Sequence, residues 1–218
     1  MEHKAISRKR KKEEVGIDGA NKKHRSDNGG IDKLPNDVLI NIVSRMSFKE
    51  AVRASVLARR WRCLWKFYHG TMRFDVRDIS PRNLMGIEKF KSCANTVMEL
   101  HQGRDVEGVV VHLEGIVNGG LFQPMSRALD ELVYFATHKE VQTLEVKLSL
   151  KFLNYRRYEL PHVGWLKSPL PYSSLRALRL THVDVTDEQV CYLLASCHSL
   201  EELCIRSANK LNNLRVVG

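Results

Sequence analysis

Thiol and imidazole side chains gather near the C-terminal end of the sequence, at Cys191, Cys197, His198 and Cys204. Side chains of these types are the usual ligands of zinc, but zinc sites place paired ligands at shorter, regular spacings. Cys191 falls within an expected helix and Cys197 near its end, where small buried residues are common. We therefore interpret the cluster as packing and expect no metal and no cofactor.

The sequence lacks the patterns that accompany catalysis. Its nine histidines are scattered, without a matching nucleophile or carboxylate pattern. There is no GxSxG elbow, no glycine-rich phosphate loop and no HExxH pair. We therefore expect no catalytic residues and a protein that is not an enzyme.

Basic side chains interleaved with tryptophans suggest a second chemistry, the binding of nucleic acid. Arginines contact phosphates and bases when a helix enters the major groove. The basic residues here are Arg53, Arg59, Arg60, Arg62 and Lys66. The apolar helix before them, and the lack of one exposed side bearing Asn, Gln and Arg, argue against this reading. A nuclear helical nucleic-acid-binding protein stays an alternative, and nucleic acid is not the expected partner.

Positive charge is concentrated at the N-terminal end of the 218-residue chain, whose formal net charge is +10. Residues 1–30 have no hydrophobic period and are predicted to be disordered. Their basic clusters, about ten residues apart, resemble a bipartite nuclear import signal. The clusters consist of Arg8, Lys9, Arg10, Lys11, Lys12, Lys22, Lys23 and Arg25. An import receptor is thus a candidate partner and the nucleus the expected location, with a solvated tail and the cytoplasm as alternatives.

Composition indicates a folded intracellular protein. Hydrophobic residues make up 43% of the chain, which supports a core. No run approaches the ~20 apolar residues of a membrane helix, and the first thirty residues do not resemble a secretory signal. The five cysteines lack close CxxC pairing, which is typical of a reducing compartment. We expect free thiols and no membrane partner.

Residues 31–74 predict three short helices. The first starts at Leu34-Pro35 and carries an apolar stripe of Val38, Leu39, Ile42, Val43 and Met46. The second starts at Ser47, which with Glu50 has the capping-box form. A third stretch carries Leu57, Trp61, Leu64 and Trp65 at helical spacing. So small a unit cannot bury all of these residues, and its exposed apolar surface is expected to dock on another protein.

The rest of the chain predicts an α/β fold. A helix is expected over residues 83–101, then a strand through Val109, Val111 and Leu113, then a helix capped by Ser126. LxxLxL patterns begin at residues 141, 175, 200 and 211, which are 34, 25 and 11 residues apart. Thr186 and Gln189 form another capping box. These patterns predict an irregular leucine-rich-repeat solenoid with strands on one side and helices on the other.

The segment LPNDVLINIVSRMSFKEAVRASVLARRWRCLWK resembles the F-box of the plant F-box proteins with leucine-rich repeats, the FBD-like group. The later segments SSLRALRLTHVDV and CHSLEELCI resemble the repeats of the same group. We therefore expect a basic tail over 1–30, a three-helix F-box over 31–72 and a repeat region over 73–218. Because the last pattern is still open at Gly218, the repeat region is expected to be incomplete.

The resemblance implies that the F-box binds a Skp-type adaptor and, through it, a cullin ubiquitin ligase of the SCF type. The repeats would then hold an unknown substrate protein for ubiquitination. The adaptor-binding residues implied are Leu34, Pro35, Val38, Leu39, Ile42, Ala51, Val52, Val56, Trp61, Leu64 and Trp65. Leu34, Pro35 and Val38 are expected to contact the adaptor directly. Val43, Met46 and Leu57 are expected in the core, and the role of the tryptophans stays open between the two.

Strand alternation predicts the substrate face, because leucines point inward and the residues between them outward. These residues are Glu145, Lys147, Arg179, Thr181, Glu202, Arg206, Asn213 and Arg215. The expected mechanism is proximity, since holding the substrate beside the ligase raises its effective concentration. A protein that only occupies the adaptor, without a substrate, is the competing hypothesis.

Overall fold

The computed structural model describes residues 30–56, 59–79, 86–113, 122–148, 157–161 and 173–213. The basic clusters, Leu57, Arg215 and most of the fourth LxxLxL pattern lie outside the described residues.

The N-terminal helical module consists of the 3₁₀-helix η1 (Ile31–Lys33), α1 (Asn36–Ser44), α2 (Phe48–Ala54) and η2 (Trp61–Phe67). The capping box of α2 is confirmed: Glu50 N donates to Ser47 Oγ at 3.3 Å, and Ser47 N donates to Glu50 Oε2 at 3.1 Å. These hydrogen bonds hold the pKa of the Glu50 carboxyl below its ordinary value. The third helical stretch is a 3₁₀-helix.

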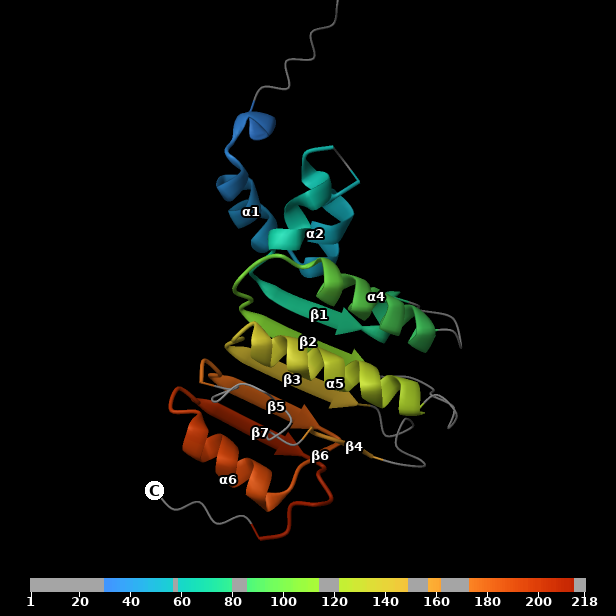
Figure 1. Ribbon diagram of the computed structural model, residues 1–218, viewed down its shortest axis with the longest axis vertical. Coiled ribbons are helices and arrows are strands. Elements are labelled where there is room, and N and C mark those ends of the chain that lie inside the picture. Colours follow the sequence, from blue (N-terminus) through green and yellow to red (C-terminus); the bar gives the residue numbers. More distant parts are fainter. Residues whose placement is uncertain are drawn as a thin grey trace, which may run out of the picture.

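Five parallel strands form the main sheet, in the order β1-β2-β3-β5-β7. Their bounds are β1 Thr71–Asp75, β2 Gly108–Leu113, β3 Thr143–Leu148, β5 Ala177–Thr181 and β7 Glu202–Arg206. The short strands β4 (Tyr158–Glu159) and β6 (Val183–Asp184) pair separately. This stack of parallel strands confirms the predicted repeat architecture, with the helical module beyond the β1 edge (Figure 1).

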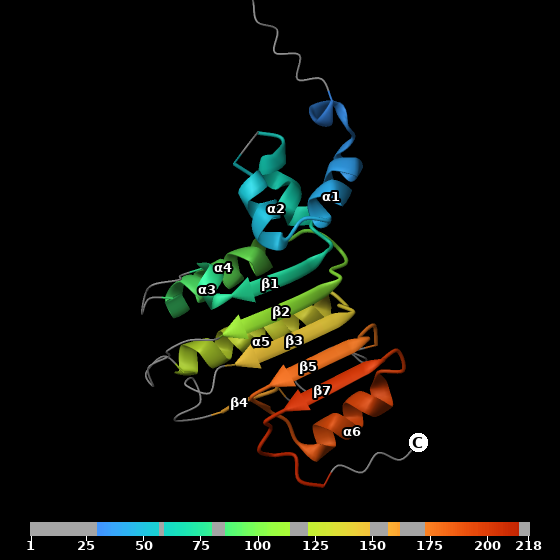
Figure 2. The same ribbon diagram turned by 180° about the vertical axis from the view of Figure 1, so that it is seen from behind.

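Helices cover one face of the sheet (Figure 1). These are α4 (Gly86–Leu100) and α5 (Phe122–His138), whereas α3 (Val76–Ile79) directly follows β1 and α6 (Asp187–Ser196) lies beside β7 (Figures 1 and 2). Figure 2 shows the opposite face, called the open face here, over which the described ranges place no helix. No helix in the described parts of the chain is long and apolar enough to cross a membrane.

Most of the expected elements are found. The strand through Val109 is β2, three of the LxxLxL patterns give β3, β5 and β7, and Thr186 caps α6 through Gln189. Ser126 is not a helix cap, because α5 already begins at Phe122. Pro124 suits that earlier start, since the first turn leaves its backbone N–H groups without helical partners anyway.

The core lies between the sheet and its covering helices. In β3, Leu144, Val146 and Leu148 are buried while Glu145 and Lys147 between them are half-buried. Parallel register places Leu144 beside Leu178 of β5, and both are fully buried. Because the apolar side chains of the strands point toward the covering helices, the charged side chains between them lie on the open face.

Hydrogen bonds join the helical module to the segments that precede β1 and follow α4. Tyr68 Oη donates to Met46 O at 3.0 Å, and His101 Nε2 lies 2.8 Å from Tyr68 O. The backbone of Lys66 accepts from Gln102 N at 2.7 Å and Gly103 N at 3.0 Å. Because these contacts join residues far apart in the sequence, the module and the sheet form one continuous packed unit.

Acidification should weaken this junction. Burial lowers the pKa of His101, with a smaller contribution from the nearby positive charge of Lys139, so the fold favours its neutral imidazole. The unfolded protein then binds more protons as pH falls through the ordinary histidine pKa, about 6.5, and stability decreases there. Urea unfolding at pH 7.5 and 5.5 should give a smaller loss for His101→Gln than for the unchanged chain.

His138→Gln is the matched control, because this histidine is exposed on the last turn of α5. It should retain the full pH dependence. Equal pH dependence in the unchanged chain and His101→Gln would contradict the role given to His101.

Candidate functional site

Exposed apolar side chains form one candidate surface, on the helical module. Val38 of α1 is 40% exposed, and Val56, directly after α2, is 82% exposed. Val52 of α2 is exposed as well, and Pro35 is the exposed N-cap of α1. Valine side chains cannot hydrogen-bond to water, so exposed valines on these short helices favour contact with another apolar surface. These four residues are called the valine face.

The structure corrects part of the predicted adaptor set. Leu39, Ala51 and Leu64 are buried in the core, so they support the module and cannot contact a partner directly. The reason is helix periodicity: Leu39 and Val43 lie one turn apart and face inward together. Val43 is buried and Met46 half-buried.

Four further residues of the predicted adaptor-binding set are neither exposed nor fully buried. They are half-buried and pack against the core: Leu34, Ile42, Trp61 and Trp65. Arg60 fixes the segment after α2 against the start of α1, because Nε and Nη2 donate to Asn36 Oδ1 at 3.1 and 2.9 Å. Because Arg60 makes these contacts within the chain, it argues against the interpretation of the basic residues as a nucleic-acid-binding surface.

Charged side chains form a second candidate surface, on the open face. Parallel register aligns Arg73, Val110, Glu145, Arg179 and Cys204 across the five strands. The next aligned row consists of Asp75, His112, Lys147, Thr181 and Arg206. Polar contacts connect many of these residues, and the charged array is defined as Arg73, Asp75, Arg77, His112, Glu145, Arg179 and Glu202.

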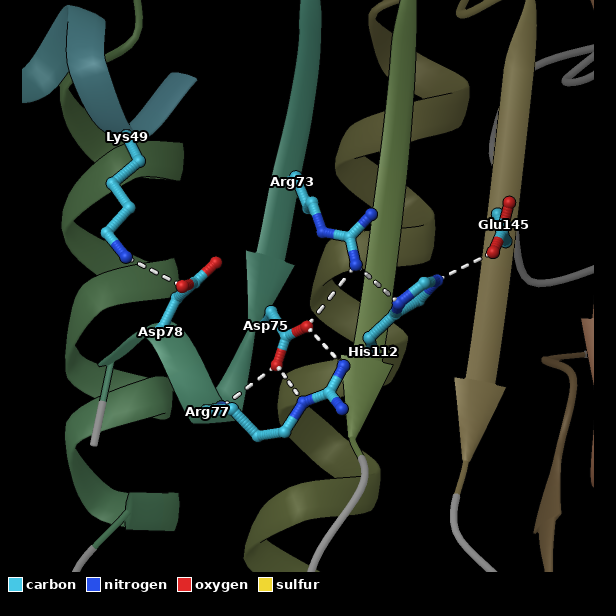
Figure 3. Close-up of polar contacts among 7 residues, drawn as sticks. All are labelled: Lys49, Arg73, Asp75, Arg77, Asp78, His112 and Glu145. Atoms are coloured by element: carbon cyan, nitrogen blue, oxygen red, sulfur yellow. Dashed lines mark hydrogen bonds and ion pairs between the residues drawn. The ribbon is translucent and has the colours of Figure 1, made fainter. Parts of the chain in front are cut away.

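Asp75, the last residue of β1, is the most buried carboxylate of the array, with its side chain 5% exposed. It accepts from Arg77 N at 2.9 Å, Arg77 Nε at 3.2 Å and Arg77 Nη2 at 3.0 Å. Arg73 Nη2 lies 3.4 Å away on the other side (Figure 3). Burial alone would raise the pKa of Asp75, but the arginine contacts outweigh it and the pKa lies below its ordinary value.

His112 connects the arginine side of the array to Glu145. Its Nδ1 lies 2.9 Å from Arg73 Nη2, and its Nε2 lies 2.6 Å from Glu145 Oε1 (Figure 3). A guanidinium only donates, so Nδ1 must accept and the ring proton is assigned to Nε2. The neutral imidazole therefore accepts from Arg73 and donates to Glu145, which fixes its orientation on the sheet.

Arg179 continues the array toward β7. Its Nε donates to Glu202 Oε1 at 2.7 Å, its Nη2 donates to the second oxygen, and its Nη1 lies 3.9 Å from Glu145 Oε2. The hydrogen bonds with Glu202 raise the pKa of Arg179 and lower that of Glu202. Side chains on the open face thus connect the neighbouring strands β3, β5 and β7.

Six of the predicted substrate residues lie on β3, β5 and β7 and belong to the open face. Glu145, Lys147, Arg179 and Thr181 are half-buried, whereas Glu202 and Arg206 are exposed. Asn213 is exposed but lies after β7, where its N–H donates to Asp187 Oδ2 at the start of α6.

Sequence reasoning missed Arg73, Asp75, Arg77 and His112. The strand β1 was not expected, although Met72 and Phe74 are buried and alternate with Arg73 and Asp75. For His112, only the apolar residues of the expected strand were considered. In both segments, the alternation of apolar and polar residues could have identified the side chains on the open face.

The cysteines do not assemble a metal site. Cys197 is buried, which raises the pKa of its thiol to about 11, while Cys191 and His198 are exposed. Across the described ranges no three His, Cys, Asp or Glu side chains come together as metal ligands.

Comparison with known proteins matches both parts of the chain. The model of the F-box domain matches residues 31–68. Residues 122–218 match a model described as "FBD-associated F-box protein At5g56370, LRR repeats". The first matched segment contains the valine face, and the second contains Glu145, Arg179 and Glu202 of the charged array. The domain bounds of 72 and 73 stay a prediction.

Similar proteins from Arabidopsis thaliana combine the same parts. F-box/FBD/LRR-repeat protein At3g26920 is 31% identical over 203 residues, which cover 84% of this chain and 43% of that protein. F-box/LRR-repeat protein At3g26922 is 29% identical over 207 residues, covering 83% of this chain and 60% of that protein. The chain therefore spans about two fifths to three fifths of the length of these relatives.

Removing the charge of Asp75 should destabilise the open face. Asp75→Asn leaves Arg73 and Arg77 without their shared carboxylate, and we expect a loss of about 1–3 kcal/mol in the free energy of unfolding at pH 7. Because the pKa of Asp75 is lowered, its stabilisation is full above the ordinary carboxyl pKa and decreases as pH falls through the folded value.

Asp78→Asn is the matched control, since Asp78 is 48% exposed and its ion pair with Lys49 faces solvent. Exposed pairs contribute at most about 1 kcal/mol. Urea unfolding of both variants measures the difference, and equal losses would remove the special role of Asp75.

Proposed function

Since the chain belongs to the plant F-box proteins with leucine-rich repeats, we propose that it is a substrate-recognition adaptor of an SCF-type ubiquitin ligase. Its F-box binds a Skp-type adaptor, which connects it to a cullin, and its repeats bind the protein to be ubiquitinated. The chain itself performs no bond chemistry. The observation that carries the proposal is the exposed valine face within the segment that matches the F-box domain.

Burial supports a division of labour within the F-box. Leu39, Ala51 and Leu64 stabilise the module from inside, and Val38, Val52 and Val56 remain outside. Interfaces of this kind obtain most of their affinity from a few apolar anchors that become fully desolvated. Val56 is the most exposed of these side chains, so it gains the most from being covered by the adaptor.

The junction supports a role in positioning the substrate. The F-box and the sheet share the buried Tyr68 and the hydrogen bonds that converge on Lys66 O and Tyr68 O. A rigid connection keeps a substrate on the open face at a constant distance from the ligase. Such fixed proximity raises the effective concentration of the substrate lysine at the ligase.

We also propose import into the nucleus. The basic clusters at Arg8–Lys12 and Lys22–Arg25 have the charge and spacing that an import receptor binds. Fluorescent fusions with and without glutamine substitutions in both clusters test this directly, and an unchanged distribution would contradict it.

A charge on the valine face should weaken adaptor binding. Val38→Asp combined with Pro35→Ala places a carboxylate where the adaptor must exclude water, so the affinity should fall by about tenfold or more. Both residues are exposed in the free chain, so folding should be retained. Co-purification with a Skp-type adaptor, followed by calorimetry, measures the loss.

Tyr192→Asp provides the matched control, because this tyrosine is also exposed and apolar but lies on α6, far from the F-box in both views (Figures 1 and 2). It should bind the adaptor normally. Failure of the unchanged chain to bind the adaptor would refute the proposed function, and unchanged affinity in the double variant would refute the role of the valine face.

A further inference from the structure

We propose that Arg73 and Arg77 form an anion site on the open face, which receives a carboxylate or phosphate group from an acidic segment of the substrate protein. This inference rests on the proposed function and adds the chemical class of the substrate. Arg73 lies on β1, the strand at one edge of the sheet, and Arg77 lies in α3, directly after β1 (Figure 3).

The carboxylate of Asp75 holds both arginines in place from below. Its side chain is 5% exposed, whereas Arg73 is 50% and Arg77 57% exposed. The acid is therefore removed from solvent, while about half of the surface of each arginine side chain is exposed. Because Asp75 already fixes the positions of both arginines, their side chains lose less conformational entropy when a ligand binds.

Arg73 retains hydrogen-bonding capacity beyond its contacts in the array. Both of its contacts, to Asp75 Oδ2 and to His112 Nδ1, use Nη2. Among the described residues, Nε and Nη1 of Arg73 have no hydrogen-bond partner. A guanidinium presents its donors as a planar fork that matches the oxygens of a carboxylate or phosphate.

The surrounding charges favour an anion. Glu145 is engaged by His112, Glu202 by Arg179, and Asp78 points away to Lys49 at 2.6 Å (Figure 3). The next row of the face adds the cations Lys147 and Arg206. Each of these acids thus already has a partner, and within the described open face the cations outnumber the acids.

A protein segment fits this face better than a nucleic acid. Binding of single strands relies on aromatic side chains that stack on the bases. The two aligned rows contain no Phe, Tyr or Trp at any of their described positions. Glutamate or aspartate side chains and phosphorylated serine supply the same chemistry, so experiment must separate these two sources.

The test uses the full chain co-purified with a Skp-type adaptor, in 150 mM salt. Three fluorescein-labelled peptides of equal length carry repeated Ser-Gly units interspersed with glutamate, phosphoserine or glutamine. Fluorescence anisotropy should show that the glutamate or the phosphoserine peptide binds about tenfold or more tightly than the glutamine peptide. Which of the two binds more tightly identifies the source of the anion.

Arginine variants locate the site. Arg73→Gln and Arg77→Gln should each weaken binding of the preferred peptide by about fivefold or more, and the lysine variants should lose less because they keep the charge. Arg176→Gln is the matched control and should bind normally: Arg176 is also 57% exposed and paired with a glutamate, but it lies before β5. The basic N-terminal clusters are the same in all variants.

Three results would overturn the anion site: equal binding of all three peptides, unchanged binding in both glutamine variants, or stronger binding of a labelled oligouridine than of either acidic peptide. Retained adaptor binding shows that each variant is folded. An unchanged chain that binds the adaptor but no acidic peptide refutes this inference alone, whereas failure to bind the adaptor refutes the proposed function.

Discussion

Burial of apolar side chains on one face of a parallel sheet is the constraint on which the other features depend. Leu144 and Leu178 occupy the same register position in neighbouring strands and are fully buried beneath the covering helices. Since successive side chains alternate between faces, this burial forces the residues between them onto the open face. The aligned rows of charged residues are a direct consequence, and Glu145 and Arg179 are neighbours for that reason.

The first strand connects this sheet to the F-box. Phe74 of β1 is buried with Phe48 of α2, and their ring centroids lie 6.0 Å apart. On the other side of the same strand, Asp75 organises Arg77 and Arg73. One short strand therefore supports both the module that carries the valine face and the charged array. Under the proposed function, this shared support would hold adaptor and substrate at a fixed distance from each other.

Local patterns predicted some of these features, and long-range contacts decided the others. The LxxLxL patterns and the Thr186 box specify β3, β5, β7 and α6 within short segments. The apolar stripe of α1 could not reveal that Leu39 is buried while Val38 is exposed, because that depends on where η2 packs. The contact between Arg73 and His112 joins residues 39 apart in the sequence and exists only because β1 and β2 pair.

The proposed function requires that the F-box binds a Skp-type adaptor through the valine face while the sheet remains free. Hydrogen exchange of the full chain, measured with and without the adaptor, tests both requirements together. We expect added protection in α1, α2 and the residues up to Val56, with β3, β5 and β7 unchanged. Protection confined to the strands, or none anywhere in the helical module, would contradict it.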